Sequence, residues 1–548
     1  MTKPSVLRSA SAMGAATFMS RILGLARELV FAYLFGASSA TDAFNVAFRI
    51  PNLLRDLFAE GAMSAALVPT FTQVRLKEGS QRAWRVAGRV FRLLFLITSL
   101  IAVAGILLSP LLVGIYAGAF KEIPGKFELA VQMTQVMFPF FPLVALAAAF
   151  MGILNACGVF FLPAFASALF NLTSILVGVT LVFLAPYFNI EPIVGMAIGV
   201  LAGGAVQAFC QLPALFKVGY RYQPVPNEPP ALKDPAIRKM FKMMIPGTVG
   251  LGATQMNLLV NTILATSQGV GAISWLNYAF RLMQFPVGIF GVSLAQATLP
   301  KISEQTAKED FKGFSETLTK SMQLSLAINL LAAAALGFLG HGIIQLLFEY
   351  GRFTSLDTES TAMALAAYAV GLAFYSAVKV LVPACYALDN TRIPVTASIL
   401  SVITTIIFNV LMVKSLGFAG LALGTSISAL INTLFLYFGI RFLLKKRGVE
   451  FSMLPLLKTT TIYLVLGIGL GFLSHLAYEN LNSYVSSDFF SEWIGKLSIP
   501  LVRALKLGTA FVVFGGATWI LAEVLKLSEF QSALSLLRQK TSKRFGKT

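Results

Sequence analysis

Charged residues are scarce in this chain. Only 12% of its 548 residues are Asp, Glu, Lys or Arg, whereas 57% are hydrophobic. Soluble domains carry about 25% charged residues. The composition therefore excludes an ordinary soluble globular domain.

Histidine and cysteine are also rare. The two histidines, His341 and His475, have no neighbours at metal-ligand spacing, and no catalytic triad is visible around them. The three cysteines lie in apolar runs without a pairing pattern, which is typical of buried thiols. The sequence also lacks a phosphate-binding P-loop, which argues against direct use of ATP. We therefore expect no metal, no cofactor and no catalytic residue.

Long uncharged runs are what the chain has instead. A membrane-spanning helix needs about 20 apolar residues. Runs without any charge, each long enough for at least one span, cover residues 93–120, 129–190, 243–280 and 415–440. A membrane β-barrel would show short alternating segments instead. The sequence predicts an all-α polytopic membrane protein.

About fourteen transmembrane helices are expected. Their predicted ranges are 10–35, 41–74, 91–117, 130–156, 160–186, 193–217, 239–267, 273–299, 319–348, 360–387, 393–413, 418–443, 455–476 and 503–525. With this count, the basic connections 75–92, 217–242 and 441–450 and the basic tail all fall on one side. The positive-inside rule makes that side, and both termini, cytoplasmic. It also accounts for the net charge of +19 without nucleic-acid binding.

The two halves of the chain resemble each other. Asn45-Val46-Ala47-Phe48-Arg49-Ile50 is matched by Asn277-Tyr278-Ala279-Phe280-Arg281-Leu282, and Gly-x-Ala-x-Gly occurs at residues 195–199 and 420–424. With these matches, span 1 corresponds to span 7 and the first six spans correspond to the next six. The repeat predicts two pseudo-symmetric six-helix lobes with a transport site between them. We assign residues 1–225 and 226–447 to the lobes, and residues 448–548 to two extra helices and a basic tail.

Arginines interrupt several predicted spans. A cation at bilayer depth costs at least about 3 kcal/mol, so such residues usually face a protein-lined or water-filled cavity. Guanidinium groups bind phosphate oxygens with two parallel hydrogen bonds. A cavity with several arginines is therefore suited to a phosphate-bearing substrate. The arginines in question are Arg21, Arg27, Arg49, Arg55 and Arg281.

The eighth predicted span carries a polar face. Ser274, Asn277, Arg281 and Gln284 are spaced three, four and three residues apart, which aligns them on one side of a helix. A hydrogen-bonding seam between helices is the alternative interpretation. The central arginine favours a cavity.

The second predicted span carries a charged stripe. Asp42, Arg49 and Asp56 are seven residues apart and could form an ion-pair ladder. Pro51 interrupts the helix, and adjacent residues on a helix do not face each other, so Asp56 is not expected to neutralise Arg55. We therefore predict Arg55 as a substrate contact and leave Arg49 between substrate binding and structural pairing.

The first span carries a similar set of charges. Arg21 and Glu28 share a helix face, whereas Arg27 points in another direction. Arg21 lies about ten residues from either end of the span, too deep to reach the interface easily, which favours a cavity. Glu60, near the basic side of the second span, is predicted only as a gate or cap.

Several motifs carry a family resemblance. They read Ser20-Arg21-Ile22-Leu23-Gly24-Leu25-Ala26-Arg27-Glu28, Thr41-Asp42-Ala43-Phe44, Pro51-Asn52-Leu53-Leu54-Arg55 and Phe58-Ala59-Glu60-Gly61-Ala62. With Ser274-Trp275 and Arg281-Leu282-Met283 in span 8, they closely resemble the MurJ (MviN) lipid II flippases of the multidrug/oligosaccharidyl-lipid/polysaccharide exporter superfamily. The resemblance covers essentially the whole chain.

The resemblance implies a function in peptidoglycan biosynthesis. It implies a flippase in the bacterial cytoplasmic (inner) membrane that moves lipid II, an undecaprenyl-diphosphate-linked disaccharide-pentapeptide, to the outer leaflet. It implies a groove for the lipid tail in the last two spans, and contacts with membrane lipids and the cell-wall synthesis machinery. Some members have an acidic residue in place of Gln284. The required positions of the family carry over onto Arg21, Arg27, Arg55, Arg281, Asp42 and Ser274.

The resulting hypothesis is alternating access. The two lobes would rock about a cationic cavity, driven by membrane potential or a monovalent ion. A cation/drug antiporter of the same superfamily is the first alternative, but it should present buried carboxylates rather than arginines. A polysaccharide-lipid exporter would differ only in cargo. A membrane glycosyltransferase would need a carboxylate pair or a histidine at the membrane edge and a large outer loop.

Overall fold

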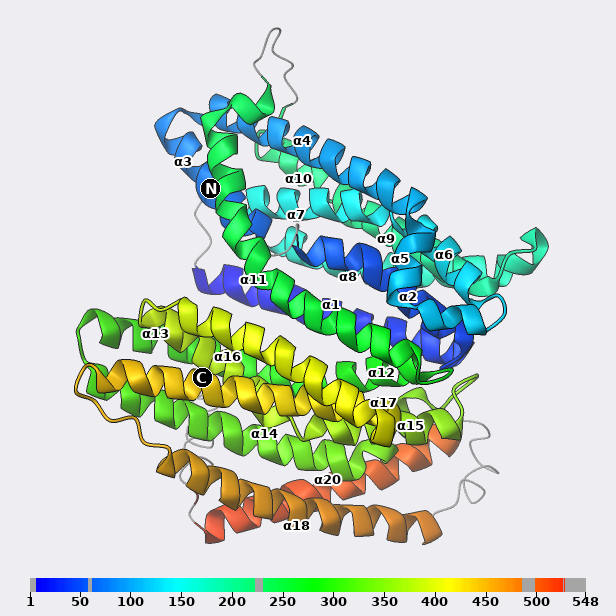
Figure 1. The fold of residues 1–548 in the computed structure, drawn as a ribbon, viewed down its shortest axis with the longest axis vertical. Coiled ribbons are helices and arrows are strands. Elements are labelled where there is room, and N and C mark those ends of the chain that lie inside the picture. The colour runs from blue at the N-terminus through cyan, green and yellow to red at the C-terminus, as the bar shows by residue number, and fades with distance from the viewer. Residues whose placement is uncertain (1–5, 58–61, 222–229, 485–497, 526, 528–548) are drawn as a thin grey trace, which may run out of the picture. The chain divides into compact units, whose positions relative to one another are not determined.

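The computed structural model describes residues 6–57, 62–221, 230–484, 498–525 and 527. Throughout this described part the regular secondary structure is helical (Figure 1), which confirms the predicted all-α class. The chain divides into two compact units, Met1–Ser274 (unit 1) and Trp275–Thr548 (unit 2).

Unit 1 contains the first half of the chain. Its helices are α1 (Val6–Phe35), α2 (Ser39–Arg55), α3 (Ala62–Lys77), α4 (Ser80–Leu107), α5 (Ser109–Tyr116), η2 (Gly118–Glu122), α6 (Lys126–Met137), α7 (Phe140–Ala156), α8 (Phe161–Leu184), η3 (Ala185–Phe188), α9 (Pro192–Phe209), α10 (Leu212–Lys217), η4 (Ala231–Lys233) and α11 (Pro235–Thr266). Its core lies where α3, α4 and α7 pack together, around Leu67, Val90 and Ile153.

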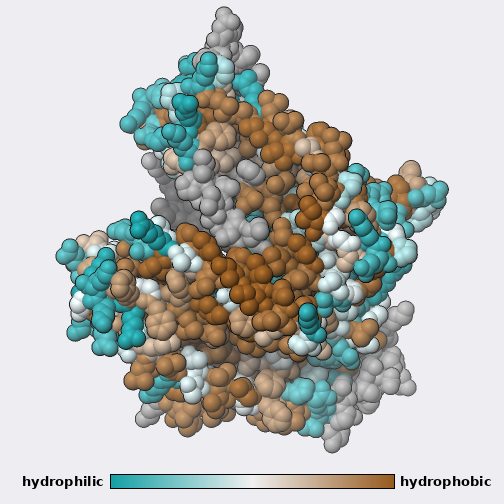
Figure 2. Space-filling model, viewed as in Figure 1, coloured by the Kyte–Doolittle hydropathy of each residue, from teal (hydrophilic) through white to brown (hydrophobic). Residues whose placement is uncertain are grey.

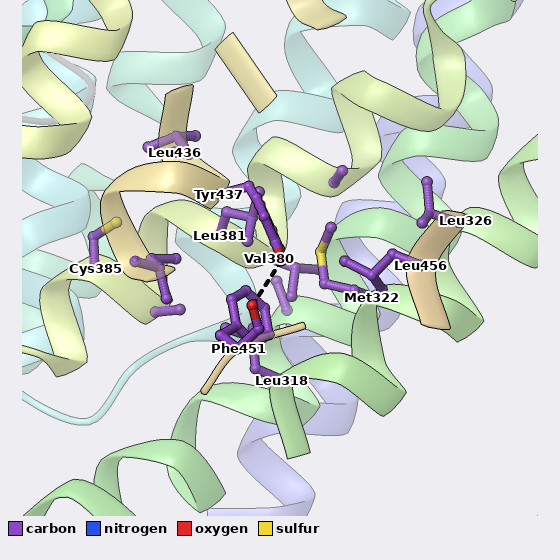
Figure 3. Close-up of a cluster of buried hydrophobic side chains, with 14 of the residues drawn as sticks. Leu318, Met322, Leu326, Val380, Leu381, Cys385, Leu436, Tyr437, Phe451 and Leu456 are labelled. Carbon is purple, nitrogen blue, oxygen red and sulfur yellow. Dashed lines mark hydrogen bonds between the residues drawn. The ribbon is translucent and has the colours of Figure 1, made fainter. Parts of the chain in front are cut away.

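Unit 2 contains the second half. Helix α12 (Ala272–Pro286) begins just before the boundary, and it is followed by the π-helix η5 (Val287–Gly291), α13 (Val292–Ala307), α14 (Phe311–Phe348), α15 (Ser355–Ala369), α16 (Leu372–Ala387), α17 (Arg392–Lys445), α18 (Leu454–Tyr484) and α20 (Ser498–Val524). Figure 3 shows its core, where Leu318 of α14, Leu381 of α16 and Tyr437 of α17 meet. The Tyr437 hydroxyl donates to the Phe451 carbonyl at 2.8 Å.

The described part of every predicted span falls largely on helix, but the count of fourteen is not confirmed. Among the described residues, nine helices are long and apolar enough to cross a membrane, or ten if the bent pair α15–α16 is one span. Two predicted spans lie within α17, which is broken only at Gly417, where φ is 56° and ψ is −138°. The first, second and seventh predicted ranges are not among these helices. Helix α1 carries Arg21, Arg27 and Glu28 within its length, α2 and α3 have only 17 and 16 residues, and the apolar part described within α11 is the short stretch Asn257–Thr266.

The boundary between the units differs from the sequence repeat. By sequence, α11 opens the second lobe, yet it packs on α3 and belongs to unit 1. The assignment of the two repeated six-helix lobes to residues 1–225 and 226–447 therefore remains a prediction from the sequence.

The repeated Gly-x-Ala-x-Gly signature has a packing role in each unit. A Cβ on Gly199 of α9 would lie 2.6 Å from the Ser174 carbonyl oxygen of α8, so only glycine lets these helices approach. In α17, a Cβ on Gly424 would overlap the side chain of Asn409, across the break at Gly417. Small residues allow close helix approach in the same way within membranes.

The outer faces of the helices are apolar. Leu100 and Leu107 of α4 and Val512 of α20 are each more than 70% exposed. On the face drawn in Figure 2, hydrophobic residues cover the flanks of the helices, and hydrophilic residues gather near their ends. This pattern is the one expected of helices that contact lipid.

Candidate functional site

Asp42 is fully buried at the start of α2. One of its carboxylate oxygens, Oδ2, lies 3.1 Å from Nζ of Lys126 at the start of α6. The Lys126 ammonium also lies 4.2 Å from the ring centre of Phe120. A buried carboxylate requires such a partner, because an isolated charge in a low-dielectric interior is very unfavourable.

The same carboxylate caps the N-terminus of α12. Asp42 accepts hydrogen bonds from the backbone N–H groups of Gly271 (2.8 Å) and Ser274 (3.1 Å) and from the Ser274 hydroxyl (2.8 Å). Asn45 also donates to the Ser274 hydroxyl, at 3.2 Å. The N-terminus of a helix has unpaired donors and partial positive charge, so it binds a carboxylate well.

This arrangement differs from the polar face expected on α12. Ser274 has no exposed surface, whereas Asn277 is half-buried and Arg281 and Gln284 are exposed. The cap explains the difference, because it encloses the first turn of the helix and leaves the later turns open. A substrate role for Asp42 and Ser274 stays a prediction, and it would require their mutual hydrogen bonds to open.

Arg27 is buried in α1 and pairs with the adjacent residue. Its Nη2 lies 3.2 Å from Oε1 of Glu28, and both side chains are less than 10% exposed. The guanidinium also lies within 6 Å of the ring centres of Phe48 and Phe170. The sequence placed Glu28 on the same face as Arg21, but in the structure Glu28 binds Arg27.

Arg55 also pairs with its neighbour. Its Nε and Nη2 donate to Oδ1 of Asp56 at 3.1 and 2.8 Å. The expectation that Asp56 would not neutralise Arg55 is therefore wrong. The long arginine side chain turns to the residue that follows it, and the backbone is π-helical at residues 56–57. Asn52 and Gln255 donate to the other carboxylate oxygen of Asp56 at 3.3 and 3.0 Å.

The other predicted site residues are exposed, half-buried or outside the described residues. Arg21 is exposed, and the half-buried Ser20 accepts a hydrogen bond from Asn171 through its carbonyl. Arg49 is half-buried; the carboxylates of its stripe have other partners, since Asp42 pairs with Lys126 and Asp56 with Arg55. Glu60 lies outside the described residues.

Two further lysines lie in helices of the two units, and only Lys126 contacts a predicted site residue. Lys126 looked like an ordinary loop residue, and only the fold brings it to Asp42. Lys379 lies in α16 and is exposed although the surrounding sequence is apolar. A lone lysine within an apolar run was the signal for it. Within the described part of the chain, no three His, Cys, Asp or Glu residues form a group able to hold a metal ion.

The candidate cations differ in exposure between the two units. In unit 1, Arg27, Arg55 and Lys126 pair with Glu28, Asp56 and Asp42. In unit 2, Arg281 and Lys379 are exposed, and both lie on helices of membrane-spanning length or composition. Chemically, such groups can bind an anion within the membrane.

Comparison with known proteins identifies relatives along most of the chain. A lipid II flippase MurJ from Burkholderia cenocepacia is 34% identical over 509 residues, covering 92% of this chain and 95% of that protein. A probable lipid II flippase MurJ from Vibrio cholerae is 35% identical over 79% of this chain and 83% of its own length.

Solved structures give the same result for the fold. A lipid II flippase MurJ in an inward closed conformation superposes with a TM-score of 0.74 at 26% identity, covering 94% of this chain and 99% of that one. An inward-facing multidrug resistance MATE family transporter of the MOP superfamily shares the fold, with a TM-score of 0.66 at 14% identity over 80% of this chain and 99% of that one. The model of the family described as lipid II flippase MurJ matches residues 31–488, and the chain belongs to that family.

Proposed function

We propose that this chain is a lipid II flippase, a transporter that moves the lipid-linked precursor of peptidoglycan across the bacterial inner membrane. The observation that carries the proposal is the family match over residues 31–488, together with relatives of that name at about one-third identity. Transport by helices that expose apolar flanks to lipid agrees with the fold. The antiporter and exporter alternatives gain no support from these relatives.

The proposal includes a chemical role for the arginines. Lipid II carries a diphosphate, and taking that group below the headgroup level is unfavourable unless charged donors replace its water. Arg21, Arg27, Arg55 and Arg281 would supply them. Arg27 and Arg55 already bind carboxylates, but a guanidinium has five N–H donors and can bind a carboxylate and a phosphate oxygen together.

The proposal also includes an orientation and a driving force. Both termini face the cytoplasm by the positive-inside rule. An inside-negative membrane potential moves anionic cargo outward, and it is worth about 2.3 kcal/mol per charge per 100 mV. Asp42 would release Ser274 when the substrate leaves on the outer side, so that the N-terminus of α12 opens once per cycle.

Leaflet-resolved labelling of lipid II tests the arginine role. Cells depleted of their own flippase would express Arg27→Ala, with Arg441→Ala, an exposed arginine of α17, as the matched control. We expect inner-leaflet lipid II to accumulate with Arg27→Ala and not with Arg441→Ala. Normal translocation by a folded Arg27→Ala protein would contradict the proposal.

A second variant separates transport from folding. Arg27→Ala alone leaves Glu28 buried without this partner, which destabilises a protein by about 3–5 kcal/mol. Arg27→Ala combined with Glu28→Gln removes both charges. We expect the double variant to recover abundance and thermal stability but not transport.

A further inference from the structure

Arg503, near the start of α20, is bound to the C-terminal end of α14. Its Nη1 donates to the carbonyl oxygens of Gln345 (3.1 Å) and Glu349 (2.9 Å), and its Nη2 lies 2.7 Å from Oε1 of Glu349. The guanidinium carbon lies 5.3 Å from the ring centre of Tyr350. The last carbonyls of a helix lack partners within the helix, and a cation is favourable there. Arg503 is therefore built into this helix end.

Glu349 connects Arg503 to α15. Its second oxygen, Oε2, accepts a hydrogen bond of 2.7 Å from the hydroxyl of Thr358, which is fully buried. The preceding residue, Asp357, closes a capping box with Thr354 at the N-terminus of α15. The segment 345–358, which we call the α14–α15 turn, is thus held by hydrogen bonds at both ends.

Helix α12 is anchored to this same turn. The indole N–H of Trp275 donates to Oδ1 of Asp357 at 2.9 Å. One helical turn further, the ring of Tyr278, only 1% exposed, lies 5.1 Å from the ring of Phe348 and 5.7 Å from that of Phe353. One hydrogen bond and two aromatic contacts therefore hold this side of α12 against the α14–α15 turn.

The anchored side of α12 determines where its polar residues point. Successive residues turn by about 100° around a helix, so Gln284 lies on the side opposite Trp275, with Arg281 between Gln284 and Tyr278. Both Arg281 and Gln284 are exposed. A rotation of α12 about its axis would turn these two side chains toward other surroundings.

The regular helix ends soon after the polar residues of α12. Pro286 closes the helix, and the π-helix η5 follows at once. Proline removes a backbone donor, and a π-helix breaks the regular hydrogen-bond ladder. The orientation of α12 therefore depends on contacts before this break: the Asp42 cap of its first turn, the anchors at Trp275 and Tyr278, and the ring of Phe280, which lies 5.5 Å from that of Tyr368 in α15.

We propose that Arg503 is a positioning residue for α12: through Glu349 it holds the α14–α15 turn, to which Trp275 and Tyr278 are anchored, and so fixes the direction of Arg281 and Gln284. Helices α18 and α20 lie outside the sequence repeat. Through Arg503, α20 would help to orient α12, the helix that carries Arg281. The consequence for transport rests on the proposed function, but the positioning itself does not.

A thiol-accessibility measurement tests the positioning without any substrate. Gln284→Cys is placed in a variant whose three native cysteines, Cys157, Cys210 and Cys385, are replaced by alanine. The rate of its modification by a hydrophilic maleimide is measured on the purified full-length protein. We compare Arg503→Gln, Arg503→Lys and the exposed control Arg441→Gln.

We expect Arg503→Gln to change the modification rate several-fold and Arg441→Gln to leave it unchanged. Arg503→Lys keeps the charge but cannot reproduce the three bonds of the planar guanidinium, so an intermediate rate is expected. Asp357→Leu, which removes the acceptor for Trp275, should shift the rate in the same direction as Arg503→Gln. Asp357→Asn keeps one acceptor oxygen and should shift it less.

The same rate for Arg503→Gln and the parent, in proteins that unfold at similar temperatures, would overturn the positioning role. If Arg503→Gln does not fold, the Asp357→Leu and Asp357→Asn pair carries the test, and equal rates for these two variants overturn the proposal. Lipid II translocation is measured separately for Arg281→Ala. A normal result there would count against the proposed function while the accessibility result would still decide the positioning.

Discussion

Asp42 accepts two hydrogen bonds from Ser274, one from its backbone N–H and one from its hydroxyl. These residues are far apart in the sequence, and each is buried in the contact. The N-terminus of α12 is thus held by a side chain of α2, and Lys126 balances the charge of that side chain. The stability of unit 1 should depend strongly on this carboxylate.

We predict that Asp42→Ala lowers the free energy of unfolding by about 3 kcal/mol or more, because it leaves the buried Lys126 ammonium without its carboxylate. Thermal unfolding of the purified protein measures the change. Asp42→Ala combined with Lys126→Met removes both charges and should recover part of the loss. A single variant as stable as the parent would show that the contact contributes nothing.

Much of the fold could be predicted from the sequence because lipid imposes simple rules. Uncharged runs must form helices, since the backbone must satisfy its own hydrogen bonds in a membrane. The number of spans is harder to predict. Two predicted spans lie in α17, which is broken at Gly417, and the second predicted range holds two short helices, α2 and α3, of 17 and 16 residues. The packing reason for Gly199 and Gly424 also needed coordinates.

The candidate site was only partly predictable. The arginines could be identified from the sequence because charged residues are rare in such apolar segments. The residues that pair with them could not. Helix periodicity assigns faces to Cβ atoms, and the long side chains of Arg27 and Arg55 reach adjacent carboxylates that periodicity places elsewhere. The contact between Asp42 and Lys126 depends on tertiary packing, which no local pattern encodes.

The packing of α9 on α8 gives a second prediction. Gly199→Ala should destabilise the protein by about 1–3 kcal/mol, because its Cβ would meet the backbone of Ser174 and Gly178. Gly508→Ala in α20 is the matched control, since a Cβ there meets nothing within 4 Å. The control should be neutral or slightly stabilising, because alanine favours helix over glycine by about 1 kcal/mol. Equal thermal midpoints for the two variants would contradict the close packing.

Lys379 gives a third prediction, about transport rather than stability. It lies about two turns from the end of α16 and is exposed, so Lys379→Ala should leave the unfolding temperature unchanged. If it faces the anionic substrate, the variant should slow lipid II translocation, and Lys379→Arg should restore most of the rate. Lys414→Ala, another exposed lysine, is the control. Normal transport by Lys379→Ala would instead indicate a side chain that only reaches toward the interface.

The thiol of Cys157, just beyond the end of α7, gives a fourth prediction. Burial raises the pKa of Cys157, and the guanidinium of Arg75, with Nη1 at 3.7 Å from Sγ, acts in the opposite direction. The thiolate is the reactive form, so a raised pKa shifts the pH dependence of alkylation to higher pH than that of a free thiol. Arg75→Gln should shift it further upward, because the remaining effect is burial alone. Iodoacetamide labelling across pH, in a variant with Cys210 and Cys385 replaced by alanine, measures both curves. A curve for Arg75→Gln at lower pH than the parent would show that Arg75 does not stabilise the thiolate.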